Sequence, residues 1–477
     1  MTMSRSHKII LFAISGLAGL LVLIAVALLV FVDANAYKPR LEAAASDALG
    51  MEVRVDGRMG FGLFPGLLVT LKDVHIRNRG TDLVSAKEVR LAVDLLPLLH
   101  DEVRIGKIAL NHPSVSIVRD SDGKFNFENP EAAGGKLPAL NLANISLSDG
   151  SLIYADKQSG EGFEAGDCKL DVRRLSLSHS KSTDLTRNLS IKAELACREI
   201  RTKDFAVSDL KFSVAGKGGV FDVTPVTMEI FGGHGSGSIR ADYSGDVPVY
   251  HVDYSLPQFR IEEFYKILSQ QKVVEGAVDF SANLSMQGKT LNEMKQTAEG
   301  EISLRGENLV FKGSDLDKEF ARFESSQSFN LVDVGAFFFA GPVGLAVTKG
   351  YSFASIFTGS GGRSDIPMLV SDWKIGHGVA QAQDVAIATN KNRVALRGGL
   401  DFAHERFDDL SMALIDAKGC AKVRQKILGT FQKPVVEKPS ILKTLTGPAL
   451  SLLKKGRDLL PGGECDVFYA GSVEPPK

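Results

Sequence analysis

The chain has little of what nucleic-acid binders and disordered proteins depend on. Among 477 residues, Lys and Arg number 56 and Asp and Glu number 57, so the formal net charge is −1. A nucleic-acid-binding protein usually carries a basic excess or a basic stripe, so the charge balance argues against a nucleic-acid partner. Hydrophobic residues make up 44% and charged residues 24% of the chain, which excludes a disordered or low-complexity sequence.

Catalytic signatures are lacking as well. The sequence contains no H-E-x-x-H and no G-x-S-x-G pattern. Gly288-Lys289-Thr290 resembles the end of a phosphate-binding loop, but Asn283 stands where that pattern needs glycine. The glycine-rich segment from Gly233 to Gly237 lies between two strand-like runs, which predicts a wide turn and not a phosphate cradle. We therefore expect a protein that is not an enzyme and that uses no cofactor and no metal.

One long hydrophobic run stands near the start. Ile9 to Val32 contains no charged residue, and a helix of this length is about 36 Å long, enough to cross a hydrocarbon core of about 30 Å. Ala34-Asn35-Ala36 resembles a signal-peptide cleavage site, so a cleaved signal is the alternative to a retained anchor. The run is longer than a signal core, and a short N-terminal tail with Asp33 after the helix favours an exported bulk.

The four cysteines become informative in an exported chain. Cys168, Cys197, Cys420 and Cys465 show no zinc-type spacing. An even number permits two disulfides, with three pairings possible. Pairing of sequence neighbours would close loops of about 29 and 45 residues, each stabilising the fold by about 3.5–4 kcal/mol through lost chain entropy. Four buried thiols are the alternative.

Hydrophobic alternation dominates the remainder. Residues 35–49 predict a short helix ended by Gly50, and the period then changes from 3.6 to 2. Phase slips at Lys72-Asp73 and at Gly106-Lys107 indicate β-bulges. Further helical signals are few, and the sequence places them at residues 261–270, 291–298, 422–428 and 449–460.

A weak internal repeat accompanies the strands. The apolar positions of residues 108–117 recur 37 residues later, at residues 145–154. Each copy reads as two strands separated by a turn, and Asp149-Gly150 is a strong hairpin signal in the second. If the repeat is real, its unit is a hairpin stacked beside the next one.

The pattern as a whole predicts a mainly β protein with six segments. These are a cytoplasmic tail at 1–8, an anchor at 9–32, an N-terminal helix and β region at 33–130, a middle β region at 131–270, a C-terminal β region at 271–420, and a helical segment with a disulfide-tethered tail at 421–477.

Two blocks of residues resemble the start of the AsmA family. The first comprises Asp33, Tyr37, Lys38, Pro39, Leu41, Glu42, Leu49, Gly50, Val53, Val55 and Gly57. The second comprises Pro97-Leu98-Leu99, the apolar positions from Val103 to Ile117, Arg119-Asp120, Gly123 and Asn126. The motifs are loose, because they record strand spacing and turns, but their combination with a single N-terminal anchor is fairly specific.

This resemblance implies a single-pass protein of a bacterial inner membrane with its bulk in the periplasm. Family members are similar to bridge-like lipid transfer proteins, which implies a long, strongly curved, mostly antiparallel sheet forming an open, taco-like groove with an apolar inside. The partners it implies are phospholipid, the inner membrane and an outer-membrane or periplasmic protein, in a role in phospholipid transport and outer-membrane biogenesis. An ordinary sandwich acting as a scaffold for outer-membrane protein assembly is the alternative.

The predicted lipid-contacting residues are those on the apolar side of the first alternating strands, nearest the anchor. They are Val53, Val55, Val69, Leu71, Val89, Leu91, Val93, Val103, Ile105, Ile108 and Leu110.

Overall fold

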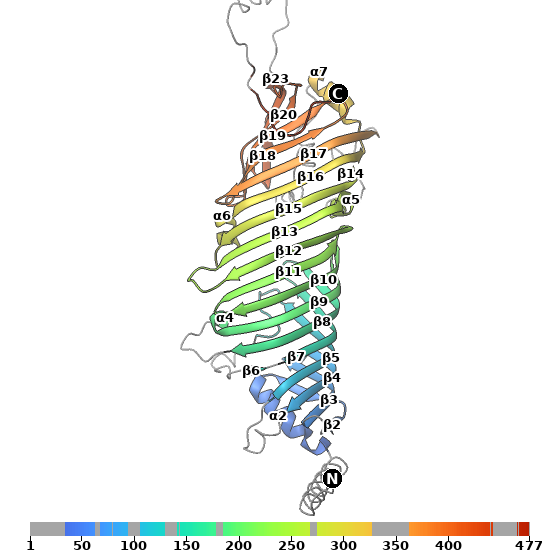
Figure 1. Cartoon of the computed structure of the whole chain (residues 1–477), viewed down its shortest axis with the longest axis vertical. Helices are drawn as coiled ribbons and strands as arrows, with labels where there is room; N and C mark the ends of the chain where they lie inside the picture. Colours follow the sequence, from blue (N-terminus) through green and yellow to red (C-terminus); the bar gives the residue numbers. More distant parts are fainter. Residues whose placement is uncertain are drawn as a thin grey trace, which may run out of the picture. The chain divides into compact units, whose positions relative to one another are not determined.

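The computed structural model is mainly β, with mostly antiparallel strands and few helices, as the sequence predicts (Figure 1). It describes residues 34–62, 67–78, 80–93, 105–128, 141–142, 144–177, 185–267, 274–326, 362–438, 440–441, 465 and 467–476. The predicted tail and anchor lie outside these residues. Within the described part of the chain, no helix has both the length and the apolarity needed to cross a membrane. The chain divides into two compact units, one ending at Gly218 and one beginning at Gly219.

The first unit is one sheet with a helix at its first edge. Strands β1 and β2 both pair with β3, which is followed across the sheet by β4, β5, β7, β8, β9 and β10, while β6 pairs with β8. Only the β5–β7 pair is parallel. The elements are η1 (Ala34–Tyr37), α2 (Lys38–Leu49), β1 (Glu52–Val55), β2 (Met59–Gly62), β3 (Leu67–Asn78), β4 (Thr81–Val93), β5 (Ile105–Arg119), β6 (Asn141–Leu142), β7 (Asn144–Asp156), β8 (Gly162–Leu177), α4 (Leu185–Asn188), β9 (Leu189–Thr202) and β10 (Ala206–Lys217).

The second unit is built from antiparallel neighbours. Its sheet runs β11, β12, β13, β15 and then consecutively to β21, with β14 on β16 and with β22 and β23 on β21. The elements are β11 (Val220–Ile230), β12 (Gly233–Asp242), β13 (Val249–Arg260), α5 (Ile261–Tyr265), β14 (Val274–Glu275), β15 (Ala277–Gln287), α6 (Leu291–Thr297), β16 (Glu299–Lys312), α7 (Leu316–Ser326), β17 (Arg363–Gly376), β18 (Val379–Ala388), β19 (Arg393–Asp401), β20 (Arg406–Ile415), β21 (Ala421–Thr430), β22 (Lys433–Val436) and β23 (Ser440–Ile441).

Helix α2 covers the edge strand β1. It begins with a proline in its first turn and ends at Gly50, which adopts a left-handed φ of 65°, so the helix predicted at 35–49 is confirmed. The Glu42 carboxylate accepts a hydrogen bond from the Val55 backbone N–H at 2.7 Å, and the Ser46 hydroxyl accepts one from Val53 at 2.8 Å. Side chains of α2 thus satisfy backbone donors that an open sheet edge would leave unpaired.

A row of left-handed residues crosses the first sheet at matching places in the register. Asp73, His112, Asp149, Asp167 and Asp209 have φ between 48° and 53° and interrupt five of its strands. At each one, two successive side chains turn to the same face, which shifts the phase of the alternation and allows the strand to bend. The slip predicted at Lys72-Asp73 is one member of this row, and the bulge predicted at Gly106 is also present.

The internal repeat corresponds to the parallel pair of strands. Ile108 lies beside Ile145, Leu110 beside Leu147, and the offset of 37 residues is kept to the end of both strands. The hairpin interpretation is wrong, because β5 and β7 are each continuous. Asp149-Gly150 resembles a hairpin turn in sequence because a left-handed Asp before Gly serves equally well at a kink within one strand.

Two other local predictions are wrong for related reasons. Residues 422–428, predicted as a helix, belong to strand β21. Val423 and Ile427 are four residues apart, a spacing that fits a helix face and a strand face alike, and pairing with β20 decides between them. The glycine-rich segment from Gly233 to Gly237, predicted as a wide turn, forms the first half of strand β12.

The two units bury apolar side chains to different extents. In the second unit one large cluster extends from Leu256 to Phe431. The outer face of β17–β20 is covered as well, because Phe468, Tyr469 and Val473 of the C-terminal segment pack on it. Strands β18 to β20 are therefore buried on both faces over much of their length. Among its described residues, the first unit has two small clusters, one beneath α2 and one around Cys168.

Candidate functional site

The candidate site is the apolar face of the first sheet, here called the inner face of the first unit. One register row crosses it from β3 to β10, and residues opposite one another in such a row point to the same face. The row consists of Leu71, Val89, Leu110, Leu147, Leu170, Leu195 and Phe212. Leu71 and Val89 are 5% and 9% exposed, whereas the other five are half-buried. Apolar side chains from β5 to β10 thus remain partly accessible.

The predicted lipid-contacting residues lie at the covered end of this face. Val53, Val55, Val69, Leu71, Val89 and Val93 are buried, and most of them share a cluster against which Leu41 of α2 packs. Leu91, Ile108 and Leu110 are half-buried on the same face. Ile105 belongs to β5, but its side chain is outside the described set, as is the whole of Val103. A lipid-contacting role for these residues stays a prediction.

Sequence reasoning missed the more accessible part of the face. Leu147, Leu170, Leu195 and Phe212 lie on β7 to β10, beyond the strands chosen for their clean alternation. Two signals could have found them. The 37-residue repeat places Leu147 beside Leu110, and the alternation around Leu195 is as regular as that near the anchor.

The opposite face of the same strands carries charges. Lys169 and Glu194, which adjoin Leu170 and Leu195 in sequence, are exposed. Arg173 pairs with Glu194 at 2.8 Å, and Arg198 pairs with Asp167 at 3.2 Å. Such exposed pairs add at most about 1 kcal/mol each, so their main consequence is the separation of a polar face from an apolar one.

Both disulfides join sequence neighbours, so that pairing is confirmed among the three that the sequence allowed. Cys168 and Cys197 lie opposite each other on β8 and β9, buried on the inner face of the first unit. Cys420 and Cys465 tether the C-terminal segment to the start of β21. Each bond stays within one unit.

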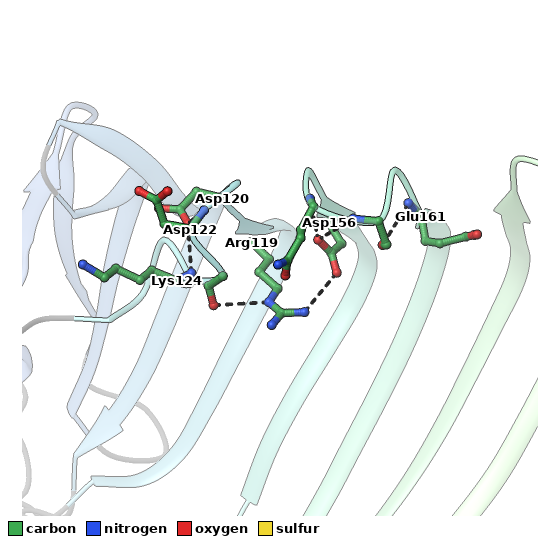
Figure 2. Close-up of polar contacts among 9 residues, drawn as sticks. Arg119, Asp120, Asp122, Lys124, Asp156 and Glu161 are labelled. Carbon is green, nitrogen blue, oxygen red and sulfur yellow. Dashed lines mark hydrogen bonds and ion pairs between the residues drawn. The ribbon is translucent and has the colours of Figure 1, made fainter. Parts of the chain in front are cut away.

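The last residues of the second family-like block, from Arg119 to Asn126, form a clasp at the ends of β5 and β7. Figure 2 shows Arg119 between two turns, its Nη1 donating to Asp156 Oδ2 and its Nε donating to the Gly123 carbonyl, each at 3.2 Å. Asp120 Oδ1 accepts the backbone N–H groups of Asp122 and Lys124 at 2.9 Å. All these contacts close loops or join neighbouring strands.

Asn126 and Asp156 complete the clasp. Asn126 Nδ2 donates to the Ser116 carbonyl at 2.7 Å, and its Oδ1 accepts the Val118 N–H at 3.0 Å. Desolvation by burial favours the neutral form of Asp156, but backbone hydrogen bonds from Gln158 and Ser159 outweigh it and hold the pKa of this carboxyl below its ordinary value. Arg119, Asp120 and Asn126 are therefore occupied in holding the turns at the ends of β5 and β7.

A cavity of about 550 Å³ lies in the second unit, on the face that also carries Met368 and Val370. Asp279, Arg305, Glu307 and Asn308 contribute to its lining. Arg305 is already paired with Asp372, and the Asp279 carboxylate accepts the Gln258 N–H at 2.7 Å. Among the described residues, no group of three or more His, Cys, Asp or Glu side chains could hold a metal ion.

Comparison with known proteins places the chain in a family. The model of the AsmA family matches residues 3–183 and 135–326, which is more than half of the sequence. No match was found among curated proteins or among solved structures. The matched residues include the helix α2, the clasp and the whole sheet of the first unit, and the chain belongs to the AsmA family.

Proposed function

We propose that the protein binds phospholipid acyl chains on the inner face of the first unit and contributes to phospholipid transport between the bacterial membranes. The observation that carries this proposal is the row from Leu110 to Phe212, in which neighbouring apolar side chains on several strands remain half-exposed. A continuous apolar surface of this kind is a liability in water unless something covers it. Acyl chains would cover it without needing a hydrogen-bonding partner.

Family membership supports the same proposal. In this proposal, residues 9–32 anchor the chain in the inner membrane, the described part lies in the periplasm, and the sheet is curved into an open groove. The headgroup stays in water and the protein performs no chemistry on the lipid. The two disulfides agree with an oxidising compartment.

The location of α2 changes where lipid would lie. Because α2 covers β1 and satisfies its backbone donors, the residues nearest the anchor are packed and not open. In the row from Leu71 to Phe212, the half-buried side chains begin at Leu110 on β5. We therefore place the acyl chain along β5 to β10 and its entrance at the side of the sheet, not at the end beneath the helix.

Site-specific photocrosslinking in cells tests this placement. A photoreactive residue at Leu170 or at Leu195 should capture phospholipid, and the matched outer-face positions Lys169 and Glu194 should not. Lipid capture at inner positions several-fold above outer ones supports the proposal. Equal labelling of both faces, or no lipid at either, contradicts it.

A second candidate is a scaffold for the assembly of outer-membrane proteins. The observation that favours it is the core of the second unit, where most apolar side chains on β17 to β20 are buried. Crosslinks to protein without lipid at Leu170 and Leu195 would support the scaffold over the lipid carrier.

A further inference from the structure

One register row across the second unit changes from accessible to buried. It comprises Val223, Ile239, Val252, Leu284, Gly300, Ile375, Ala380 and Leu400, which lie opposite one another on β11 to β19 and define the inner face of this unit. Ile239 is 39% exposed, and Val223, Val252 and Leu284 are half-buried. Beyond β16 the exposure falls to 8% at Ile375 and to zero at Ala380.

Helices of the same chain account for part of the change. Helix α5 contributes Phe264 and Tyr265 to the main core, and α7 contributes Leu316 and Phe320. All four side chains are at most 3% exposed. The inner face is therefore already occupied by the protein's own side chains where it meets β16 and the strands that follow.

The aromatic side chain of Tyr254, on β13, packs against the main core of the second unit. Tyr254 lies opposite Gly237, and its ring reaches over Gly235. A Cβ atom at Gly235 would collide with the Tyr254 hydroxyl, so glycine is required for the ring to lie against β12. The Cα and Cβ atoms of Phe259 lie close to Gly233, and the Phe259 ring contacts Phe231 and Phe264 at centroid distances of 6.2 and 6.4 Å. The glycines of β12 thus make room for aromatic residues on the inner face.

We propose that the inner face of β11 to β15 also takes acyl chains, and that this surface has a closed end at Tyr254 and the aromatic cluster behind it. This inference rests on the proposed function. In it, β11 to β15 accept the end of an acyl chain, whereas β17 to β21 are a structural core that no lipid enters. The protein then holds a lipid of limited length and releases it through the open side, instead of passing it onward through the C-terminal strands.

Labelling from the lipid side tests the closed end without altering the protein. The probe is a phosphatidylethanolamine with a diazirine at the last carbons of one acyl chain, loaded onto the full-length protein in detergent and mapped by mass spectrometry after irradiation. A second probe with the diazirine near the middle of the chain serves for comparison. We expect terminal-carbon adducts on β11 to β15 and none on β18 to β20.

A variant sharpens the test. Tyr254→Ala should move terminal-carbon adducts toward the neighbouring inner positions Leu256 and Phe280, whereas His251→Ala, an exposed position on the opposite face of the same strand, should leave the adduct pattern unchanged. If Tyr254→Ala does not fold, the wild-type map still decides.

The outcomes separate the two proposals. Adducts on β18 to β20 would disprove the closed end while leaving lipid binding intact. Adducts confined to the first unit would also disprove it, because the inner face of the second unit would then take no acyl chain. No adduct anywhere, with either probe, would contradict the proposed function itself.

Discussion

The inner faces of the two units have the same alternating sequence pattern but differ in how far their apolar side chains are exposed. In the first unit, the row from Leu110 to Phe212 stays half-exposed across β5 to β10. In the second, residues at equivalent alternating positions of β18 and β19, such as Ala380 and Leu400, are almost completely buried. Alternation decides which face is apolar, and covering elements decide whether that face becomes core or surface.

The two units differ in which elements pack on their sheets. The first unit has one helix over its edge, which shields only the first strands. The second has α5 and α7 on one face and the C-terminal segment on the other. In the proposed function, acyl chains cover the inner face of the first unit, whereas on β17 to β21 of the second unit the protein's own side chains cover it.

The largest expected effect compares two leucine truncations. Leu414→Ala, on β20 and fully buried, should lower the free energy of unfolding by about 3–5 kcal/mol, because it leaves a cavity in a packed core. Leu195→Ala, half-buried on β9, should cost about 1 kcal/mol because less apolar surface is involved. Urea unfolding of the two variants measures both values. Equal losses would show that the inner face of the first unit is as sealed as the core of the second.

The second-largest effect is expected from removing the disulfide that tethers the C-terminal segment. Replacing Cys420 and Cys465 by serine removes a loop constraint of 45 residues, which should lower the stability of the second unit by about 4 kcal/mol. The outer face of β17–β20 should then lose its cover. Limited proteolysis should cut within residues 465–476 faster than in wild type. The matched Cys168/Cys197 double replacement should leave cleavage of that segment unchanged.

A smaller effect is expected at the helix that covers β1. Glu42→Ala removes the acceptor for the buried Val55 N–H, which should cost about 1–2 kcal/mol. Hydrogen exchange at Val55 should accelerate while exchange on β20 stays unchanged. Asp47→Ala, an exposed position on the same helix, is the control and should alter neither. If Val55 keeps its protection without Glu42, α2 is not what closes this end of the sheet.

The smallest effect concerns pH. Burial alone would raise the pKa of Asp384. The Asp384 carboxylate accepts hydrogen bonds from the Ser472 hydroxyl at 2.6 Å and from the Tyr469 hydroxyl at 2.5 Å. These bonds outweigh burial, so the pKa of Asp384 in the folded protein lies below the ordinary value of 3.8. The stabilisation is therefore present above about pH 4 and is lost as the pH falls through the lowered folded pKa.

Hydrogen exchange can test this direction of the pH dependence. Hydrogen exchange in residues 467–476 should be faster at pH 3 than at pH 6 in wild type, after correction for the intrinsic pH dependence. Asp384→Asn should show most of the loss already at pH 6. Asp365→Asn, on an exposed side chain, should behave as wild type. If the corrected hydrogen-exchange rate of residues 467–476 in wild type does not change with pH, the Asp384 carboxylate does not hold the C-terminal segment on the outer face.

Much of the fold could be predicted from local patterns. The helix ending at Gly50, the slip at Asp73 and the bulge at Gly106 all follow from residues within a few positions of one another. The predictions failed where one local pattern fits two structures. Asp149-Gly150 suits a hairpin or a kink, and Val423 with Ile427 suits a helix or a strand, so the partner strand had to decide.

The sequence by itself determined which side chains share a face, because alternation and its slips are written in the order of residues. It also indicated the family and the number of cysteines available for pairing. Only the tertiary structure decided which parts of the apolar face are covered, which cysteines join, and where Tyr254 finds room over the glycines of β12. The physical reason is that burial depends on contacts between segments far apart in the chain, and no local period records them.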